Sequence, residues 1–158
     1  MRCTETASSG PFLINNMKNA EINLGYGCNS VCYFCVSGDA SNLEKRFASQ
    51  KKINTEILSL YRKGFRSLGI LGGEPTLYPH ICEIVSYAKK IGYRRIAVTT
   101  NGMLLAKKIF IEELVKAGMN RFSVSVHAHR AKDEDIITGI PGSFRKKIEA
   151  IKNLVALR

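Results

Sequence analysis

Three cysteines in one short stretch are the residues of this sequence best suited to metal chemistry. Cys28, Cys32 and Cys35 stand in a C-x3-C-x2-C pattern. Thiolates at this spacing on a compact loop can reach one metal centre, and four-iron clusters usually take four cysteine ligands. Three nearby ligands leave one iron without a protein thiolate, and an open position is typical of catalytic metal sites. By spacing alone, a zinc site with a distant fourth ligand such as His80 or Cys82 is the alternative.

The length and composition predict one soluble domain in the cytoplasm. The 158 residues are 45% hydrophobic and 23% charged, which is ordinary for a globular protein. The sequence has no apolar run near the roughly 20 residues of a membrane helix and no signal-peptide pattern, so we expect neither membrane insertion nor export. Five cysteines, an odd number, argue against a disulfide framework. We expect Cys82 to be a small buried helix residue, and Cys3 has no assigned role.

The chain is basic, with a formal net charge of +11. A basic surface can attract nucleic acid or an acidic substrate. The lysines and arginines are spread over every predicted helix instead of one arm, so we interpret them chiefly as solvated helix faces. Nucleic acid stays open as an alternative partner.

Short β-rich runs alternate with amphipathic helical segments along the chain. The predicted strands are residues 21–24, 67–71, 95–99 and 121–126. The predicted helices cover about 50–63, 78–91 and 107–117, and a fourth begins near Ser143 as its N-cap, with an apolar stripe of Phe144, Ile148, Ile151, Leu154 and Val155. The first three end at glycines, and each leads into a strand. This order predicts an α/β fold of right-handed βαβ units around a parallel sheet.

The clustered cysteines fall in an insertion after the first predicted strand. The later strands begin at spacings near the roughly 30 residues of a βαβ unit, whereas the first interval is much longer. The excess, residues 25–48, contains all three cysteines. This places them at the carboxyl end of the first strand, where α/β folds hold their ligands. Four strands are too few for a closed eight-stranded barrel, which typically needs about 250 residues.

A second motif follows the next predicted strand. Gly72, Gly73 and Glu74 precede Pro75 in a strand-ending turn. Paired glycines let a ligand approach the backbone closely and expose its carbonyls. Carbonyls together with a carboxylate suit an ammonium group, so this turn is a candidate site for an amine.

The two motifs together resemble a known family. With Phe34 directly before its third cysteine, the loop resembles the signature of the radical S-adenosylmethionine (radical SAM) superfamily, and residues 72–74 are similar to that family's GGE motif. The resemblance covers about residue 20 onward and sets the zinc alternative aside. It implies that Cys28, Cys32 and Cys35 ligate three irons of a [4Fe–4S] cluster, while S-adenosylmethionine chelates the fourth.

The resemblance also implies a reaction. An external electron donor, flavodoxin-like or ferredoxin-like, would start cleavage of S-adenosylmethionine to methionine and a 5′-deoxyadenosyl radical, which abstracts hydrogen from a substrate. Residues 135–144 resemble the linker before the fourth helix in members that modify peptides or make cofactors. A peptide or a small molecule is therefore the favoured class of substrate.

Six residues are implied to contact the cofactor. Phe34 would lie near the adenine, and the 72–74 motif would meet the methionyl amino group. Asn101, in an Asn-Gly turn after the third strand, would meet the cofactor or the substrate. Ser125, near the end of the fourth strand, would meet the ribose or the methionyl carboxylate. The cofactor-binding set is thus Phe34, Gly72, Gly73, Glu74, Asn101 and Ser125. His127 and His129 have no assigned role.

The chain departs from the family pattern in length. The family core is a partial parallel (βα) barrel of six units, and we expect only four of them here. Residues 19–158 would form the N-terminal two-thirds of that barrel, after a flexible lead-in at residues 1–18. The fourth strand would then present an open edge, so a subunit that completes the barrel is a candidate partner. The alternative to an enzyme is a non-catalytic iron–sulfur-binding remnant or subunit.

Overall fold

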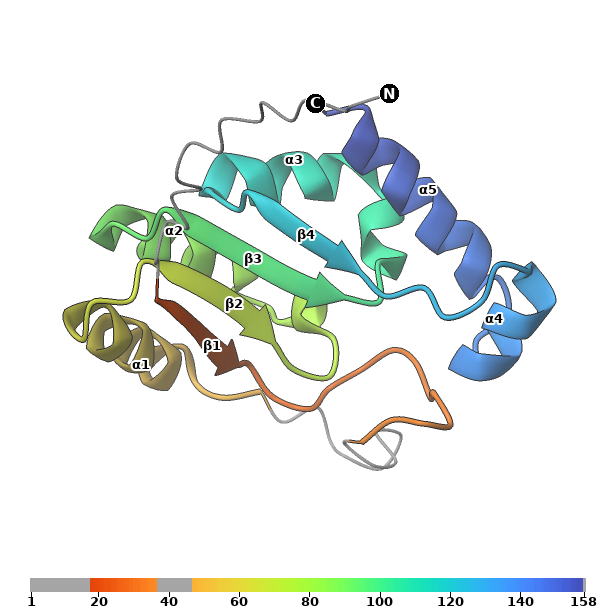
Figure 1. Ribbon diagram of the computed structural model, residues 1–158, viewed down its shortest axis with the longest axis horizontal. Helices are drawn as coiled ribbons and strands as arrows, with labels where there is room; N and C mark the ends of the chain where they lie inside the picture. The colour runs from red at the N-terminus through yellow and green to blue at the C-terminus, as the bar shows by residue number, and fades with distance from the viewer. Residues whose placement is uncertain (1–17, 37–46, 158) are drawn as a thin grey trace, which may run out of the picture.

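The computed structural model describes residues 18–36 and 47–157. Strands and helices alternate along them (Figure 1). The elements are β1 (Asn19–Asn23), α1 (Gln50–Arg62), β2 (Ser67–Leu71), η1 (Pro75–Leu77), α2 (Ile81–Ile91), β3 (Arg95–Thr100), η2 (Met103–Ala106), α3 (Lys108–Ala117), β4 (Arg121–Val124), α4 (Ala131–Thr138) and α5 (Ser143–Val155). Cys3 and the predicted lead-in, up to residue 17, lie outside the described residues.

The four strands form one parallel sheet in the order β1-β2-β3-β4. In Figure 1 the strands lie in front of α1, α2 and α3, which cover the same face of the sheet. The carboxyl ends of all four strands lie at the same end of the sheet, because each helix returns the chain to the other end before the next strand begins. The α/β fold and the parallel sheet predicted from the sequence are confirmed.

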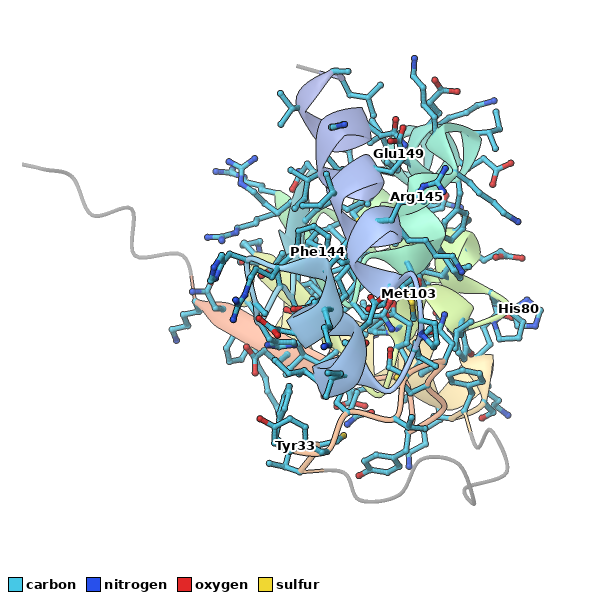
Figure 2. All side chains as sticks on the ribbon, turned by 90° about the vertical axis from the view of Figure 1, so that its right-hand side faces the viewer. Tyr33, His80, Met103, Phe144, Arg145 and Glu149 are labelled. Carbon is cyan, nitrogen blue, oxygen red and sulfur yellow. The ribbon has the colours of Figure 1, made fainter. Side chains whose placement is uncertain are left out.

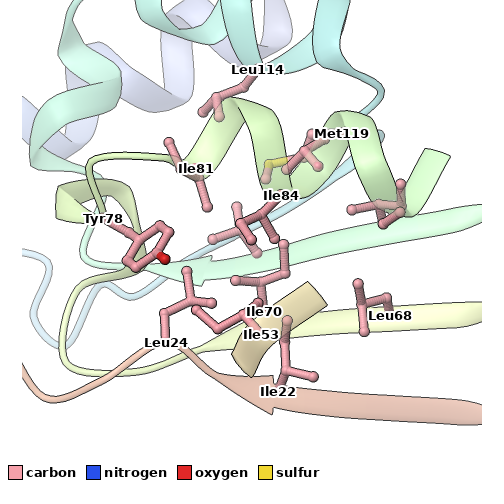
Figure 3. Close-up of a cluster of buried hydrophobic side chains, with 14 of the residues drawn as sticks. Ile22, Leu24, Ile53, Leu68, Ile70, Tyr78, Ile81, Ile84, Leu114 and Met119 are labelled. Carbon is pink, nitrogen blue, oxygen red and sulfur yellow. The ribbon is translucent and has the colours of Figure 1, made fainter. Parts of the chain in front are cut away.

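The helix-covered face of the sheet forms the core. Ile22, Ile70 and Val98 alternate with more exposed residues along their strands and are almost fully buried. They pack with apolar residues of the helices, among them Ile84 of α2, as Figure 3 shows. The opposite face carries Glu21 and its register partner Gly69 and is only partly covered by the described residues. Among those residues, no helix has the length and apolar character needed to cross a bilayer.

The helix α2 begins three residues later than predicted. Tyr78 has an extended backbone with ψ of 123°, and the helix starts at Ile81. The reason is Pro79, because a proline ring disfavours helical geometry in the residue before it. A short 3-10 turn over Pro75–Leu77 precedes the helix instead.

The region after β4 also departs from the prediction. The helix α4 was not expected, because the only side chains that it buries are those of Glu134 and Thr138, which give no apolar stripe. In α5, Gly142 is the N-cap, and Ser143 is the first helical residue and is buried. The predicted stripe of α5 is therefore wrong in part: Ile151 and Val155 are 36% and 61% exposed, and the fully buried positions are Ser143, Lys147 and Ala150.

Candidate metal and cofactor site

The cysteine loop leaves β1 at the carboxyl end of the sheet. Cys28 and Cys32 are half-buried and Cys35 is exposed, and all three are free thiols. The N–H of Cys35 donates to the carbonyl of Cys32 over 3.0 Å, which closes a tight turn between two of the three cysteines. Burial raises the pKa of the Cys28 and Cys32 thiols. Metal binding at this loop would therefore displace protons, since a thiolate is the ligand form.

The three cysteines have the donor chemistry that an iron–sulfur cluster needs. Among the described residues, no group of three potential ligands converges closely enough to hold one metal ion. Three unpaired thiols on one loop, two of them half-buried, fit the donor set of an iron–sulfur cluster.

The glycine pair after β2 is where the cysteine loop docks. The N–H of Gly73 donates to the carbonyl of Gly25, and the N–H of Glu74 donates to that of Gly27, each over 2.8 Å. A Cβ atom at Gly73 would lie 2.6 Å from the carbonyl oxygen of Gly27, closer than real Cβ atoms come. Glycine is thus required at Gly73 because the chain's own cysteine loop passes too close for a side chain. Contact of Gly72 and Gly73 with a cofactor stays a prediction.

Glu74 joins the carboxyl ends of β2 and β3. Its side chain is fully buried. One carboxylate oxygen accepts from the N–H and the hydroxyl of Thr76 and, over 2.7 Å, from the hydroxyl of Thr100. The other oxygen accepts from the N–H of Asn101 over 2.6 Å. These protein donors already occupy the carboxylate. An amine could therefore contact this motif only through its backbone carbonyl groups.

Asn101 lies beside the cysteine loop. Its side-chain amide donates to the side-chain oxygen of Asn29 over 2.7 Å and is 4.0 Å from the sulfur of Cys28. Its oxygen accepts from the N–H of Met103, which fixes the orientation of the amide. The structure therefore brings this residue, predicted from the Asn-Gly turn, within reach of a predicted cluster ligand.

Phe34 and Ser125 each contact a residue at the end of a strand or just after it. The Phe34 ring is 47% exposed and meets the ring of His127 edge-to-face, with centroids 4.7 Å apart. Ser125 is half-buried, and its N–H donates to the carbonyl of Thr100 over 2.9 Å, which extends the pairing of β4 with β3. Residues of the loop and of three strand ends thus gather at the carboxyl end of the sheet.

This arrangement has counterparts among known proteins. The family model of the radical SAM superfamily matches residues 22–158. The chain belongs to this superfamily. Radical SAM proteins bind a [4Fe–4S] cluster and S-adenosylmethionine, so the predicted family, fold and cofactors are confirmed. The assignment of individual residues to these groups stays a prediction.

The radical SAM relatives include two probable GTP 3′,8-cyclases. That of Saccharolobus islandicus is 34% identical over 144 residues, which is 88% of this chain and 44% of that protein. That of Sulfurisphaera tokodaii is 31% identical over 145 residues, 89% of this chain and 44% of that protein. The chain therefore spans less than half the length of these curated relatives.

A solved radical SAM structure shares the fold. The structure of Streptococcus suis SuiB bound to the precursor peptide SuiA superposes with a TM-score of 0.66 and 27% identity, over 84% of this chain and 29% of that one. The structure of SuiB bound to S-adenosylmethionine has a TM-score of 0.62 at 23% identity, over 82% of this chain and 28% of that one. This second likeness concerns the fold alone.

Sequence reasoning missed a buried pair of charged residues on the last two helices. Glu134 and Lys147 form a buried ion pair. Burial raises the pKa of Glu134, but hydrogen bonds from Lys147 and from two backbone N–H groups outweigh it and hold the pKa below its usual range. No sequence signal marks these two residues, because charged residues in helices normally lie on solvated faces.

Proposed function

We propose that this chain forms the cluster-binding and cofactor-binding part of a cytoplasmic radical SAM enzyme. The observation that carries the proposal is the loop of three free cysteines, docked by backbone hydrogen bonds on the glycine pair at the carboxyl ends of the strands. When bound, the reduced cluster supplies the electron that cleaves S-adenosylmethionine to methionine and a 5′-deoxyadenosyl radical, which abstracts hydrogen from the substrate.

Each part of the chain has a defined task in this proposal. Cys28, Cys32 and Cys35 ligate three irons, and the open position takes the cofactor. The backbone at Gly72 and Gly73 receives the methionyl amino group, while the buried carboxylate of Glu74 holds the motif in place. The residues that flank the cofactor are Phe34, Asn101 and Ser125. An external flavodoxin-like or ferredoxin-like protein delivers the electron.

For the substrate, we propose a small molecule or a peptide, as the names of the relatives indicate for those proteins. The names of the more similar relatives specify GTP, and the SuiB neighbour is bound to a precursor peptide. The matched part covers 44% of the GTP 3′,8-cyclase and 29% of SuiB. The match therefore does not identify the residues that select a substrate. Incubation with GTP and with peptides separates these two classes.

Anaerobic reconstitution tests the proposal. The chain should take up about four irons and, with dithionite and S-adenosylmethionine, release 5′-deoxyadenosine. Replacing Cys28, Cys32 and Cys35 together by Ala should abolish both. Cys82→Ala is the matched control, because this half-buried free cysteine belongs to α2 and not to the loop. Zinc without iron, or iron uptake that survives the triple replacement, would overturn the assignment of the cluster.

The alternative is a cluster-binding module without turnover. The observation that favours it is that β4, among the described residues, pairs only with β3, so the sheet can take a further strand from another chain. Cluster absorbance without 5′-deoxyadenosine would support this alternative against the enzyme. Restoration of 5′-deoxyadenosine by an added protein would identify a subunit that completes the barrel.

A further inference from the structure

A buried ion pair joins the last two helices close to the cysteine loop. The ammonium of Lys147, on α5, donates to one carboxylate oxygen of Glu134, on α4, over 2.5 Å, and the side chains are 1% and 0% exposed. Lys and Glu are almost never fully buried unless they are paired. Because apolar residues often stabilise a core as well as a buried ion pair does, stability alone does not explain this pair.

The second oxygen of Glu134 holds the turn that follows β4. It accepts from the N–H of His127 over 2.8 Å and from the N–H of Ala128 over 2.7 Å. One carboxylate therefore fixes both α5 and the end of the fourth strand to α4. The His127 ring in turn packs against the Phe34 ring of the cysteine loop.

The carboxyl end of α4 holds the cysteine loop itself. The carbonyl of Thr138 accepts from the N–H of Val31 over 3.0 Å, and that of Ile137 accepts from the N–H of Tyr33 over 3.3 Å. These two anchored residues flank Cys32 in the sequence. Figure 2 shows α5 extending up from α4, with Tyr33 below α4. Glu134 thus stands one helical turn before Thr138, so the ion pair and the anchors of the cysteine loop belong to the same short helix.

We propose that the Glu134–Lys147 ion pair positions Cys32 by fixing α4 and the turn after β4 against the cysteine loop. Both are positioning residues, since among the described residues their side chains make hydrogen bonds to each other and to the turn after β4, and to no cysteine. A carboxylate is required at Glu134 because it must accept from a cation and from two backbone N–H groups at once. An apolar substitute could fill the space but would leave those two N–H groups without their acceptor.

Amide hydrogen exchange of the metal-free, full 158-residue chain tests the positioning. In Lys147→Met, protection of the Val31 and Tyr33 amides should fall at least tenfold more than protection of core-strand amides such as Ile70. The matched control is Lys108→Met with Glu112→Gln, which removes an exposed ion pair whose charged atoms are 3.9 Å apart. This control should leave the protection of Val31 and of Tyr33, each relative to that of Ile70, unchanged. Equal loss of protection in the loop and the core would overturn the proposal, because the pair would then serve stability alone.

A second variant covers the case in which Lys147→Met fails to fold. Glu134→Gln combined with Lys147→Met leaves no unpaired buried charge, and the same selective loss at Val31 and Tyr33 is expected. Unchanged loop protection in this folded variant would overturn the proposal.

The spectrum of the reconstituted cluster gives a further readout, which rests on the proposed function. The change in the electron paramagnetic resonance spectrum on adding S-adenosylmethionine should be altered in the Lys147 variant and unaltered in the surface control. If S-adenosylmethionine shifts the spectrum of the Lys147 variant in the same way as that of the parent chain, the ion pair does not position the metal centre. A chain that binds no iron would defeat the proposed function, and the exchange result would still decide the positioning.

Discussion

At the scale of single residues, the site depends on a carboxylate that never reaches solvent. Glu74 is fully buried and accepts hydrogen bonds from residues 76, 100 and 101, at the ends of two neighbouring strands. A buried carboxylate is tolerated only where donors replace its water shell. The same segment leaves no room for a Cβ at Gly73, because the cysteine loop crosses there. Both residues therefore serve the docking of the loop.

The first prediction concerns Glu74→Gln. The new NH2 group would face a backbone N–H at Asn101 or, if flipped, the N–H of Thr76, so one donor would lose its acceptor. We expect the free energy of unfolding to fall by about 1–3 kcal/mol, measured by urea denaturation. The same change at the exposed Glu113 is the control and should alter stability by less than about 0.5 kcal/mol. Equal stability of the two variants would contradict the role of the carboxylate.

The second prediction concerns Gly73→Ala. The added methyl group would meet the carbonyl oxygens of Tyr26 and Gly27, and these backbone atoms can give way only if the cysteine loop moves. Overpacking of this kind costs about 1–3 kcal/mol, and we expect iron uptake on reconstitution to fall with it. Gly69→Ala is the control, because its nearest neighbour is the flexible side chain of Glu21, 3.2 Å away. Full iron uptake by Gly73→Ala would argue against the docking.

At the scale of elements, the apolar pattern of the sequence predicted the strands and helices that pack through apolar side chains, and it failed where polar residues are buried. The four strands were located to within two residues at either end, since Ile, Leu and Val mark them and polar turns end them. The helix α4 was missed because it packs through the polar residues Glu134 and Thr138, which bond to the N–H of His127 and the hydroxyl of Ser143 and leave no apolar pattern in the sequence. The wrong stripe of α5 has the same cause, because Lys147 takes a core position that the pattern assigned to solvent.

The connection between α4 and α5 gives a third prediction, on pH. The carboxylate of Asp135 accepts from the N–H groups of Phe144 and Gly142 and from the hydroxyl of Ser143, and these bonds hold its pKa below the ordinary 3.8. A lowered pKa in the folded state adds stability that is complete well above 3.8 and is lost as the pH falls through the folded value.

Asp135→Asn should therefore lower stability at neutral pH and reduce the further loss of stability below about pH 4. Urea denaturation between neutral and acid pH measures both effects. Asp133→Asn, which removes only an exposed pair with Arg130, is the control and should keep the acid dependence of the parent chain. An unchanged acid profile in Asp135→Asn would show that other carboxylates determine it.

At the scale of the whole molecule, the sequence predicted that the two motifs lie together but not the contacts between them. The order of strands placed the cysteine loop and the 72–74 turn at the same edge of the sheet, as the structure shows. The hydrogen bond from Asn101 to Asn29 joins residues 72 apart in the sequence, and no local pattern encodes such a pairing. The placement of chemistry thus follows from topology, whereas the fine geometry follows from tertiary packing.

The sheet edge at β4 gives a fourth prediction. Among the described residues, β4 pairs only with β3, which leaves one row of its backbone N–H and C=O groups unpaired. Exposed apolar side chains lie near in sequence, such as Val126 at 38% exposure. Such an edge is a template for another chain, so we expect self-association of the 158-residue chain that grows with concentration in sedimentation velocity.

Charge should control that association. The net charge of +11 repels like copies at low ionic strength, and salt screens it, so added salt should strengthen association. Ser123→Lys places a further charge on the edge strand and should weaken association, whereas Ser59→Lys adds the same charge on the exposed surface of α1 and should weaken it less. Equal effects would mean that net charge alone governs association, because only a contact at β4 distinguishes the two positions.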